Sequence, residues 1–181
     1  MIPFRVLLVH NHVSGHPVTW LSFLIRVVTC SKWNHVALEF TYQGQRQVVE
    51  SIGKGVICTP WEEWFTHARR IVKPMSRAGL EVAADVLLGD LVGQPYGFLD
   101  LMQLFLHLVR TRWLGSSRSW NGRDGVFGRP GLFCSELVAL LLGYPAPHLV
   151  TPGDLEHCRD LVPGAEFTTG PGENLTGGPQ F

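Results

Sequence analysis

Up to residue 73, most hydrophobic residues fall in short runs or alternate with polar ones, which is typical of β-strands. Residues 5–9, Arg-Val-Leu-Leu-Val, are rich in leucine and valine and suit a buried strand. Two alternating segments at 32–40 and 46–52 flank a glycine-containing turn and predict a β-hairpin. Further short strands are expected at 56–59 and 69–73, with one helical turn between them. The first half of the chain therefore predicts a sheet.

The turn of this hairpin decides which residues face one another across the two strands. With Gln43-Gly44 as a two-residue turn, Ala37 pairs with Glu50. His35 lies two residues before Ala37 on the same strand face, so His35 and Glu50 become diagonal neighbours. A register shifted by one residue would send them to opposite faces. The pairing therefore predicts a His–Glu contact; the alternative is a core histidine beside an exposed strand carboxylate.

Apolar residues recur at helical spacing at 20–28 and again after residue 73. Ser76 is a suitable N-cap for an amphipathic helix that ends near Gly93. The following helix, 98–114, is apolar almost all round, apart from one polar stripe formed by Asp100, Gln103, His107 and Arg110. A helix of this kind is usually buried in the centre of a domain. The alternative is that part of its surface contacts a lipid or a partner.

A short apolar helix follows the break at Pro130-Gly131 and begins with Cys134. Its apolar residues share one face and Gly143 is a natural end; they are Cys134, Leu137, Val138, Leu141 and Leu142. A thiol in the first turn of a helix meets free backbone N–H groups and the positive end of the helix dipole, which favour the thiolate. The position therefore suits a nucleophile; the alternative is a buried core cysteine.

Composition limits the class of protein to which the chain can belong. Its 181 residues, 45% of them hydrophobic, suffice for one well-buried domain. Fifteen basic residues balance fifteen acidic ones, so the net charge gives no indication of nucleic acid as a partner. The four cysteines form no CxxC pair, and His10, His12 and His16 have no further ligand at a familiar spacing. No metal and no cofactor are therefore expected.

Residues 1–9 contain no cationic leader and no small-residue cleavage site, so cytoplasmic synthesis without a signal peptide is expected. Polar residues interrupt the longest apolar segments, and no membrane-spanning segment is expected either. Residues 113–130 are rich in Gly, Ser and Arg and suit a long surface loop. Residues 163–181 are expected to be an extended or disordered tail unless a partner orders them, which leaves 1–162 as the folded domain.

Three short motifs stand in the order histidine, acid, cysteine along the chain. They are Trp33-Asn-His35, Val49-Glu50-Ser51 and Phe133-Cys134-Ser-Glu-Leu-Val. This order resembles the circularly permuted branch of the papain-like NlpC superfamily, the YaeF/YiiX type amidases and peptidases. Gly93-Gln-Pro-Tyr-Gly97 and Thr151-Pro-Gly-Asp-Leu155 support the resemblance, which covers residues 5–160.

The resemblance implies an α+β fold of the permuted papain-like type, in which an antiparallel sheet packs against helices that include the cysteine helix. It also implies a catalytic triad, with Cys134 as nucleophile, His35 as general base and Glu50 as the residue that orients the imidazole. The backbone N–H of Cys134 and one further donor would stabilise the oxyanion. Tyr96 and a backbone group near the N-terminal strand are both candidates for that donor.

The sequence leaves several functions open. The first is a cysteine hydrolase that cleaves amide bonds in bacterial cell-wall peptides. A virion or another delivery machine would carry the enzyme to the cell wall. The second is a lipid amidase or acyltransferase, in which the apolar helix 98–114 forms part of an acyl groove. The third is a structural or assembly protein that retains the fold and binds a partner through its tail. The expected partners are therefore a peptide or acyl-amide substrate and an assembly partner for the tail.

Overall fold

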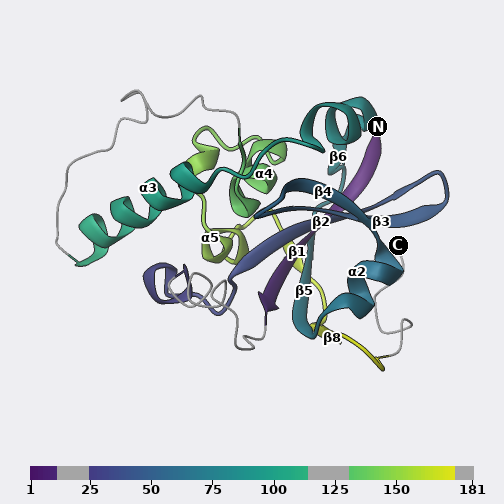
Figure 1. The fold of residues 1–181 in the computed structure, drawn as a ribbon, viewed down its shortest axis with the longest axis horizontal. Helices are drawn as coiled ribbons and strands as arrows, with labels where there is room; N and C mark the ends of the chain where they lie inside the picture. The colour runs from purple at the N-terminus through teal and green to yellow at the C-terminus, as the bar shows by residue number, and fades with distance from the viewer. Residues whose placement is uncertain (12–24, 114–130, 174–181) are drawn as a thin grey trace.

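The computed structural model describes residues 1–11, 25–113 and 131–173, which form an α+β fold. Its centre is an eight-stranded sheet with the strand order β4-β3-β2-β1-β5-β7, in which β6 pairs with β1 and β8 with β5 (Figure 1). The pairs of named strands are antiparallel, as the resemblance implies. The strands are β1 (Ile2–Asn11), β2 (His35–Tyr42), β3 (Gln45–Ile52), β4 (Gly55–Pro60), β5 (Arg70–Ser76), β6 (Glu81–Val82), β7 (Val162–Pro163) and β8 (Phe167–Thr169). The helices are α2 (Trp61–His67), the π-helices η1 (Asp85–Leu91) and η2 (Val109–Trp113), α3 (Phe98–Leu108), α4 (Cys134–Leu141), the 3-10 helix η3 (Pro147–Leu149) and α5 (Pro152–Glu156).

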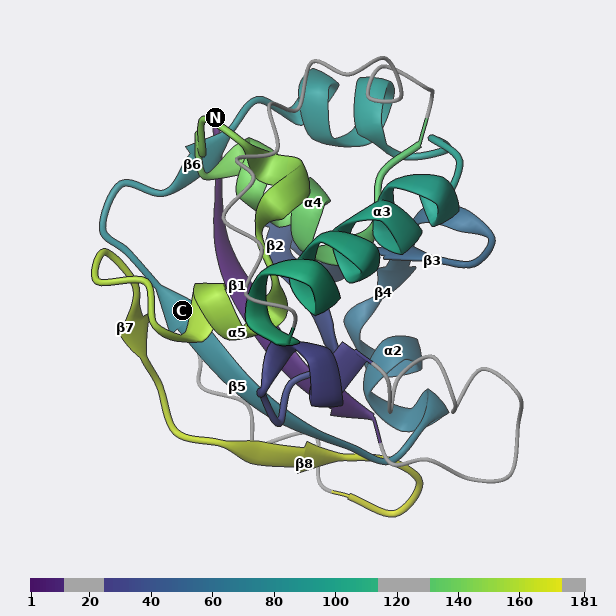
Figure 2. The same cartoon turned by 90° about the vertical axis from the view of Figure 1, so that its left-hand side faces the viewer.

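Strand β1 lies inside the sheet and is buried on both faces. Its residues Val6, Leu7, Leu8 and Val9 are fully buried. Val6 and Leu8 belong to a larger core shared with α4, α5 and η1, whereas Leu7 and Val9 belong to a smaller core shared with α2. Figure 2 views the sheet from the side that carries α4 and α5. Because both faces are covered, the strand needs no polar alternation, which explains its continuous hydrophobic run.

The hairpin formed by β2 and β3 has the predicted register. Ala37 pairs with Glu50. The turn residues Gln43 and Gly44 both have positive φ, 51° and 76°, as a two-residue hairpin turn of this kind requires. The confirmed register places His35 on the same face as Glu50.

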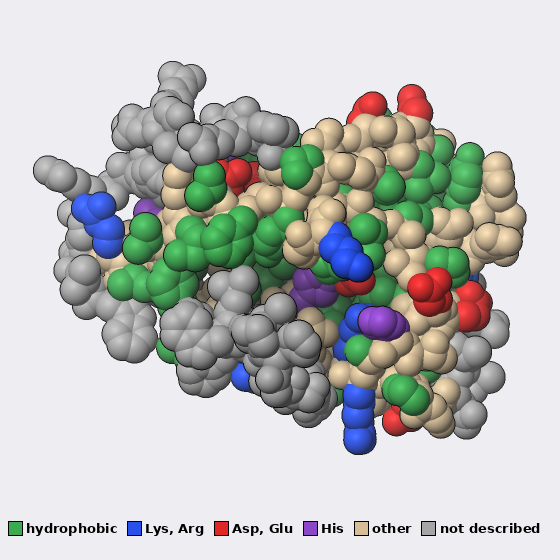
Figure 3. Space-filling view, in the orientation of Figure 1, with side chains coloured by type: hydrophobic (Ala, Val, Ile, Leu, Met, Phe, Trp, Pro, Cys, Tyr) green, Lys and Arg blue, Asp and Glu red, His purple; other side chains and the backbone are tan. Residues whose placement is uncertain are grey.

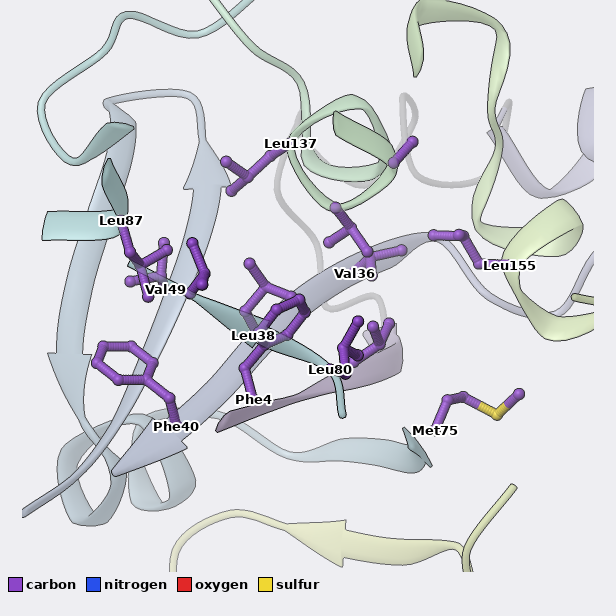
Figure 4. Close-up of a cluster of buried hydrophobic side chains, with 14 of the residues drawn as sticks. Phe4, Val36, Leu38, Phe40, Val49, Met75, Leu80, Leu87, Leu137 and Leu155 are labelled. Atoms are coloured by element: carbon purple, nitrogen blue, oxygen red, sulfur yellow. The ribbon is translucent and has the colours of Figure 1, made fainter. Parts of the chain in front are cut away.

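The larger core lies between one face of the sheet and the helices α4, α5 and η1 (Figure 4). Val36 and Leu38 of β2 belong to this core together with Leu137 of α4. Helix α4 packs against both β2 and β3. The first residue of α4, Cys134, therefore lies near the first residue of β2, His35.

The segment after β5 differs from the helix predicted to start at Ser76. Ser76 is the last residue of β5, Gly79 follows in a turn with φ +72°, and Glu81–Val82 pairs with β1 as β6. Helical structure begins at residue 84 and continues as η1. The predicted N-cap at Ser76 is wrong because strand pairing with a distant segment overrides the local spacing of apolar residues.

Helix α3 begins where the sequence predicts an apolar helix, but it is not central. Of its residues, Asp100, Leu101 and Leu104 are buried. Phe98 and Leu106 are about half exposed. The expectation of a centrally buried helix is wrong, and the alternative of a partly exposed apolar surface describes α3.

The tail predicted from residue 163 is extended where the structure describes it, and β8 pairs with β5. Residues 167–169 are therefore part of the sheet. Residues 25–29 are helical, which confirms the end of the helix predicted at 20–28. The rest of that predicted helix, most of the predicted loop at 113–130 and residues 174–181 lie outside the described residues. None of the helices in the described part of the chain is long and apolar enough to cross a membrane.

Candidate active site

Two backbone segments cross at glycines just before α4 and set the position of Cys134. Gly131 has φ +146°, and a Cβ there would lie 3.1 Å from Gly97 Cα. A Cβ on Gly97 would in turn lie 3.2 Å from the carbonyl carbon of Gly131, so a side chain on either residue would press on backbone. The Leu132 N–H donates to the Pro95 carbonyl at 3.0 Å. The motif around Gly97 therefore holds the chain at the point where it turns into α4.

Helix α4 starts directly after this crossing, with Cys134 as its first residue. Phe133 is extended, with φ −91° and ψ 167°, and its N–H donates to the Glu136 carboxylate at 3.4 Å. Burial raises the pKa of Glu136 to about 7; the Phe133 N–H opposes this shift and the nearby Asp100 adds to it. At the other end, Gly143 follows the helix with φ +76°, as its predicted role as the stop requires.

His35 lies between Glu50 and Cys134. Its Nε2 is 2.7 Å from Glu50 Oε2. The side chain of Cys134 is the other polar neighbour of the same imidazole. Because Glu50 engages Nε2, Nδ1 is the nitrogen left for the sulfur. The three residues are 9%, 5% and 5% exposed, so the site is almost closed to bulk water.

The charges of this group favour a protonated imidazole. Burial by itself lowers the pKa of His35, but hydrogen bonding and charge from Cys134 and Glu50 raise it to about 10. For Glu50, burial raises the pKa, but the His35 hydrogen bond and charge outweigh this effect and lower the pKa to about 2. At neutral pH the site therefore holds an imidazolium between a carboxylate and the sulfur, so His35 already carries the proton that it can later give to a leaving group.

Two further side chains, Arg70 and Trp64, act on Glu50, and neither was predicted from the sequence. The Arg70 guanidinium lies 4.6 Å from the Trp64 ring centre and donates from Nη1 to the Trp64 carbonyl at 3.3 Å. The positive charge of Arg70 also lowers the pKa of Glu50. The Trp64 indole N–H, which meets no acceptor at full hydrogen-bond geometry, adds to this effect. No local pattern marks either residue, because α2 and β5 reach Glu50 only in the folded chain.

Tyr96, the residue predicted as a candidate oxyanion or substrate contact, lies near the sulfur. Its backbone forms a bridge with Leu132, two residues before Cys134. Burial raises the pKa of the Tyr96 hydroxyl, and the negative charge of Cys134 raises it further. The phenol therefore keeps its proton and remains a hydrogen-bond donor close to the nucleophile.

An apolar pocket includes Cys134 in its lining. Its empty space is about 370 Å³ when the open solvent at its mouth is counted, whereas its cavity volume is about 30 Å³. Leu101, Leu104 and Leu108 of α3 form one wall, and Phe133 and Cys134 lie at the start of α4. Residues 25–29 and the start of α5 complete the lining.

The hydroxyl groups in the lining do not make this pocket polar. Thr29 donates to the Ile25 carbonyl at 2.7 Å, and Ser135 donates to the Val150 carbonyl at 2.7 Å. Thr151 is the N-cap residue of α5, and its hydroxyl donates to the Asp154 carboxylate at 2.6 Å. All three donors are therefore used within the protein, and the pocket offers mainly hydrocarbon to a ligand.

Comparison with protein-family models gives no match for this chain. Comparison with curated proteins gives none either. The permuted papain-like family therefore stays a resemblance carried by the three motifs and their order along the chain.

Proposed function

We propose that this protein is a cysteine hydrolase in which Cys134 attacks a carbonyl carbon, His35 transfers protons and Glu50 holds the imidazole. The observation that carries the proposal is the buried His35 ring, which has Glu50 Oε2 at 2.7 Å from Nε2 and Cys134 as its other polar neighbour. A structural cysteine has no need of an ion pair of this kind, since burying two charges costs free energy.

The reaction follows the usual chemistry of a cysteine–histidine pair. Cys134 gives its proton to His35, and the thiolate attacks the carbonyl to form a tetrahedral intermediate. The backbone N–H of Cys134 at the start of α4 and the Tyr96 hydroxyl are the candidate donors to its oxyanion. The imidazolium then protonates the leaving amine or alcohol, which leaves a thioester. Water, deprotonated by His35, hydrolyses the thioester and regenerates the thiol.

The apolar pocket favours a substrate whose carbonyl is attached to a hydrocarbon chain. A hydrocarbon chain gains free energy when it leaves water for such a pocket. A cell-wall peptide would place polar amide and carboxylate groups where the lining hydroxyls Thr29, Ser135 and Thr151 are already engaged, and unpaired polar groups are costly to bury. We therefore infer that the lipid amidase or esterase function fits better than cleavage of cell-wall peptides.

Turnover of matched substrates tests this proposal. The purified chain is given short-chain and long-chain N-acyl amides and esters, and purified cell-wall peptides in parallel. We expect the highest kcat/KM for long-chain acyl substrates. Cys134→Ser and His35→Ala should each abolish turnover, and Cys158→Ser, which changes a half-buried cysteine outside the site, should not.

The outcomes separate the three functions. Turnover retained by Cys134→Ser would contradict the nucleophile assignment. Turnover of cell-wall peptides alone would restore the first function and reject the acyl substrate. No turnover, together with alkylation of Cys134 by iodoacetamide no faster than that of an ordinary thiol, would support a structural or assembly role.

A further inference from the structure

Helix α3 carries its polar and apolar residues in an unusual arrangement. A helix on a protein surface normally turns its polar side outward. In α3 the acidic residue Asp100 is 4% exposed, whereas Phe98, Leu99 and Leu106 are 52%, 49% and 56% exposed. Hydrophobic side chains accordingly gather on the surface over α3 (Figure 3). This surface, called here the outer face of α3, consists of Phe98, Leu99 and Leu106.

The opposite side of the same helix lines the apolar pocket. Leu101, Leu104 and Leu108 line the same pocket as Cys134. The outer face and the pocket are therefore separated by little more than the width of one helix, which is about 10 Å. A hydrocarbon chain held at the outer face would therefore have only about one helix width to travel to the pocket.

The charged residues on and next to α3 also suit contact with a lipid surface. Asp100 is the sole acidic residue between positions 98 and 113, and it is buried. Arg110, in η2 just after α3, is exposed. An apolar face with a cation at its end and no exposed acid suits the boundary between acyl chains and phosphate headgroups.

The size of the outer face disfavours a second protein copy as its occupant. Phe98, Leu99 and Leu106 are each about half exposed, so together they present roughly 300 Å² of surface to solvent. A stable protein interface buries about 800 Å² on each partner. Shallow insertion into a bilayer has no such minimum area, because each side chain that leaves water contributes separately.

We propose that the outer face of α3 lies on the surface of a lipid bilayer, from which the protein takes an acyl substrate into the neighbouring pocket. The choice of an acyl substrate rests on the proposed function, whereas binding of the face to lipid does not depend on catalysis. The two parts can therefore be measured separately.

Vesicle binding by the full chain is the first test. Phosphatidylcholine vesicles, with and without phosphatidylglycerol, are mixed with the protein and separated by flotation. We expect the wild type to float with the vesicles. In Leu99→Gln/Leu106→Gln, each lost side chain should lower partitioning roughly tenfold. The matched control is Val162→Gln, which changes a valine of β7 that is 64% exposed and lies away from α3.

Several results would overturn the proposal. They are failure of the wild type to bind either kind of vesicle, equal binding by the double variant, and a wild-type dimer in light scattering that the double variant converts to a monomer. Because both leucines are exposed, the double variant should fold, and an unchanged thermal unfolding midpoint checks this.

Turnover then distinguishes a failure of lipid binding from a failure of the proposed function. The double variant should hydrolyse a soluble short-chain ester as fast as the wild type but lose turnover of a substrate embedded in vesicles. Cys134→Ser should bind vesicles normally and hydrolyse neither. A double variant that hydrolyses the embedded substrate at the wild-type rate would contradict the route along α3.

Discussion

Replacement of Glu50 by glutamine removes the charge on which the candidate site depends. Glutamine has nearly the same shape, and its amide oxygen can still accept a hydrogen bond from His35. The substitution therefore removes a negative charge from an oxygen that lies 2.7 Å from His35 Nε2 and leaves the packing largely in place. A change in behaviour can then be assigned to charge rather than to a cavity.

The expected size of the effect follows from the distance between the charges. Two unit charges about 4 Å apart interact by ~4 kcal/mol at an effective dielectric constant of about 20. Since one pKa unit corresponds to ~1.4 kcal/mol, loss of the carboxylate should lower the pKa of His35 by ~1 to 3 units. The direction is downward because burial alone lowers this pKa, and Cys134 and Glu50 are what raise it to about 10 in the wild type.

The assay is the pH dependence of kcat/KM, with the rate of Cys134 alkylation by iodoacetamide as a readout that needs no substrate. The basic limb of the profile should move to lower pH, because the imidazolium loses its proton earlier. The rate at neutral pH should fall at least ~10-fold, which corresponds to ~1.4 kcal/mol of lost charge stabilisation. Glu63→Gln, an exposed position on α2, is the matched control.

An unmoved basic limb, together with a rate within about twofold of the wild type, would refute the reasoning. Glu50 would then be a structural carboxylate, and the sulfur would depend on His35 alone.

The other predictions concern stability and the pocket. The unfolding free energy should fall at both pH extremes. Folding raises the pKa of His35 from 6.5 to about 10, so its contribution is full below 6.5 and is lost as the pH rises through about 10. Folding lowers the pKa of Glu50 from 4.5 to about 2, so its contribution is present above 4.5 and is lost as the pH falls to about 2. Urea unfolding across this pH range measures both, and a flat curve would contradict the ion pair. Gly131→Ala should cost ~2 kcal/mol or more in urea unfolding because its Cβ would press on backbone; Gly89→Ala, with nothing within 4 Å of its Cβ, is the control and should cost nothing. Leu108→Trp should narrow the pocket and lower kcat/KM for long-chain substrates ~10-fold, and an equal loss for short-chain substrates would show that the pocket does not hold the chain.

Some features of the fold follow from a few neighbouring residues, and the sequence predicts these well. The hairpin register depends on whether Gln43 and Gly44 can adopt positive φ, which both do. The limits of α4 likewise depend on the break before it and on Gly143 after it. The side-chain contact between His35 and Glu50 could be predicted for this reason, because one local turn decides it.

Features that depend on distant parts of the chain were missed. β6 replaces the first turn of a predicted helix, because Glu81–Val82 finds a partner in β1. Arg70 and Trp64 reach Glu50 from β5 and α2, and nothing in their local sequence indicates this. The exposure of α3 was also mispredicted, since hydrophobicity alone cannot tell a buried side from one that faces outward.

The amino-acid sequence by itself determined the candidate chemistry of this protein: a thiol at a helix start and an imidazole one diagonal step from a carboxylate. Both depend on backbone geometry over a few residues, which side-chain size and glycine placement control. Only the tertiary structure decided that α4 packs across β2 so that Cys134 meets His35, and that α3 leaves an apolar pocket beside the sulfur. These arrangements come from burial of hydrophobic surface between distant segments, which no local pattern specifies.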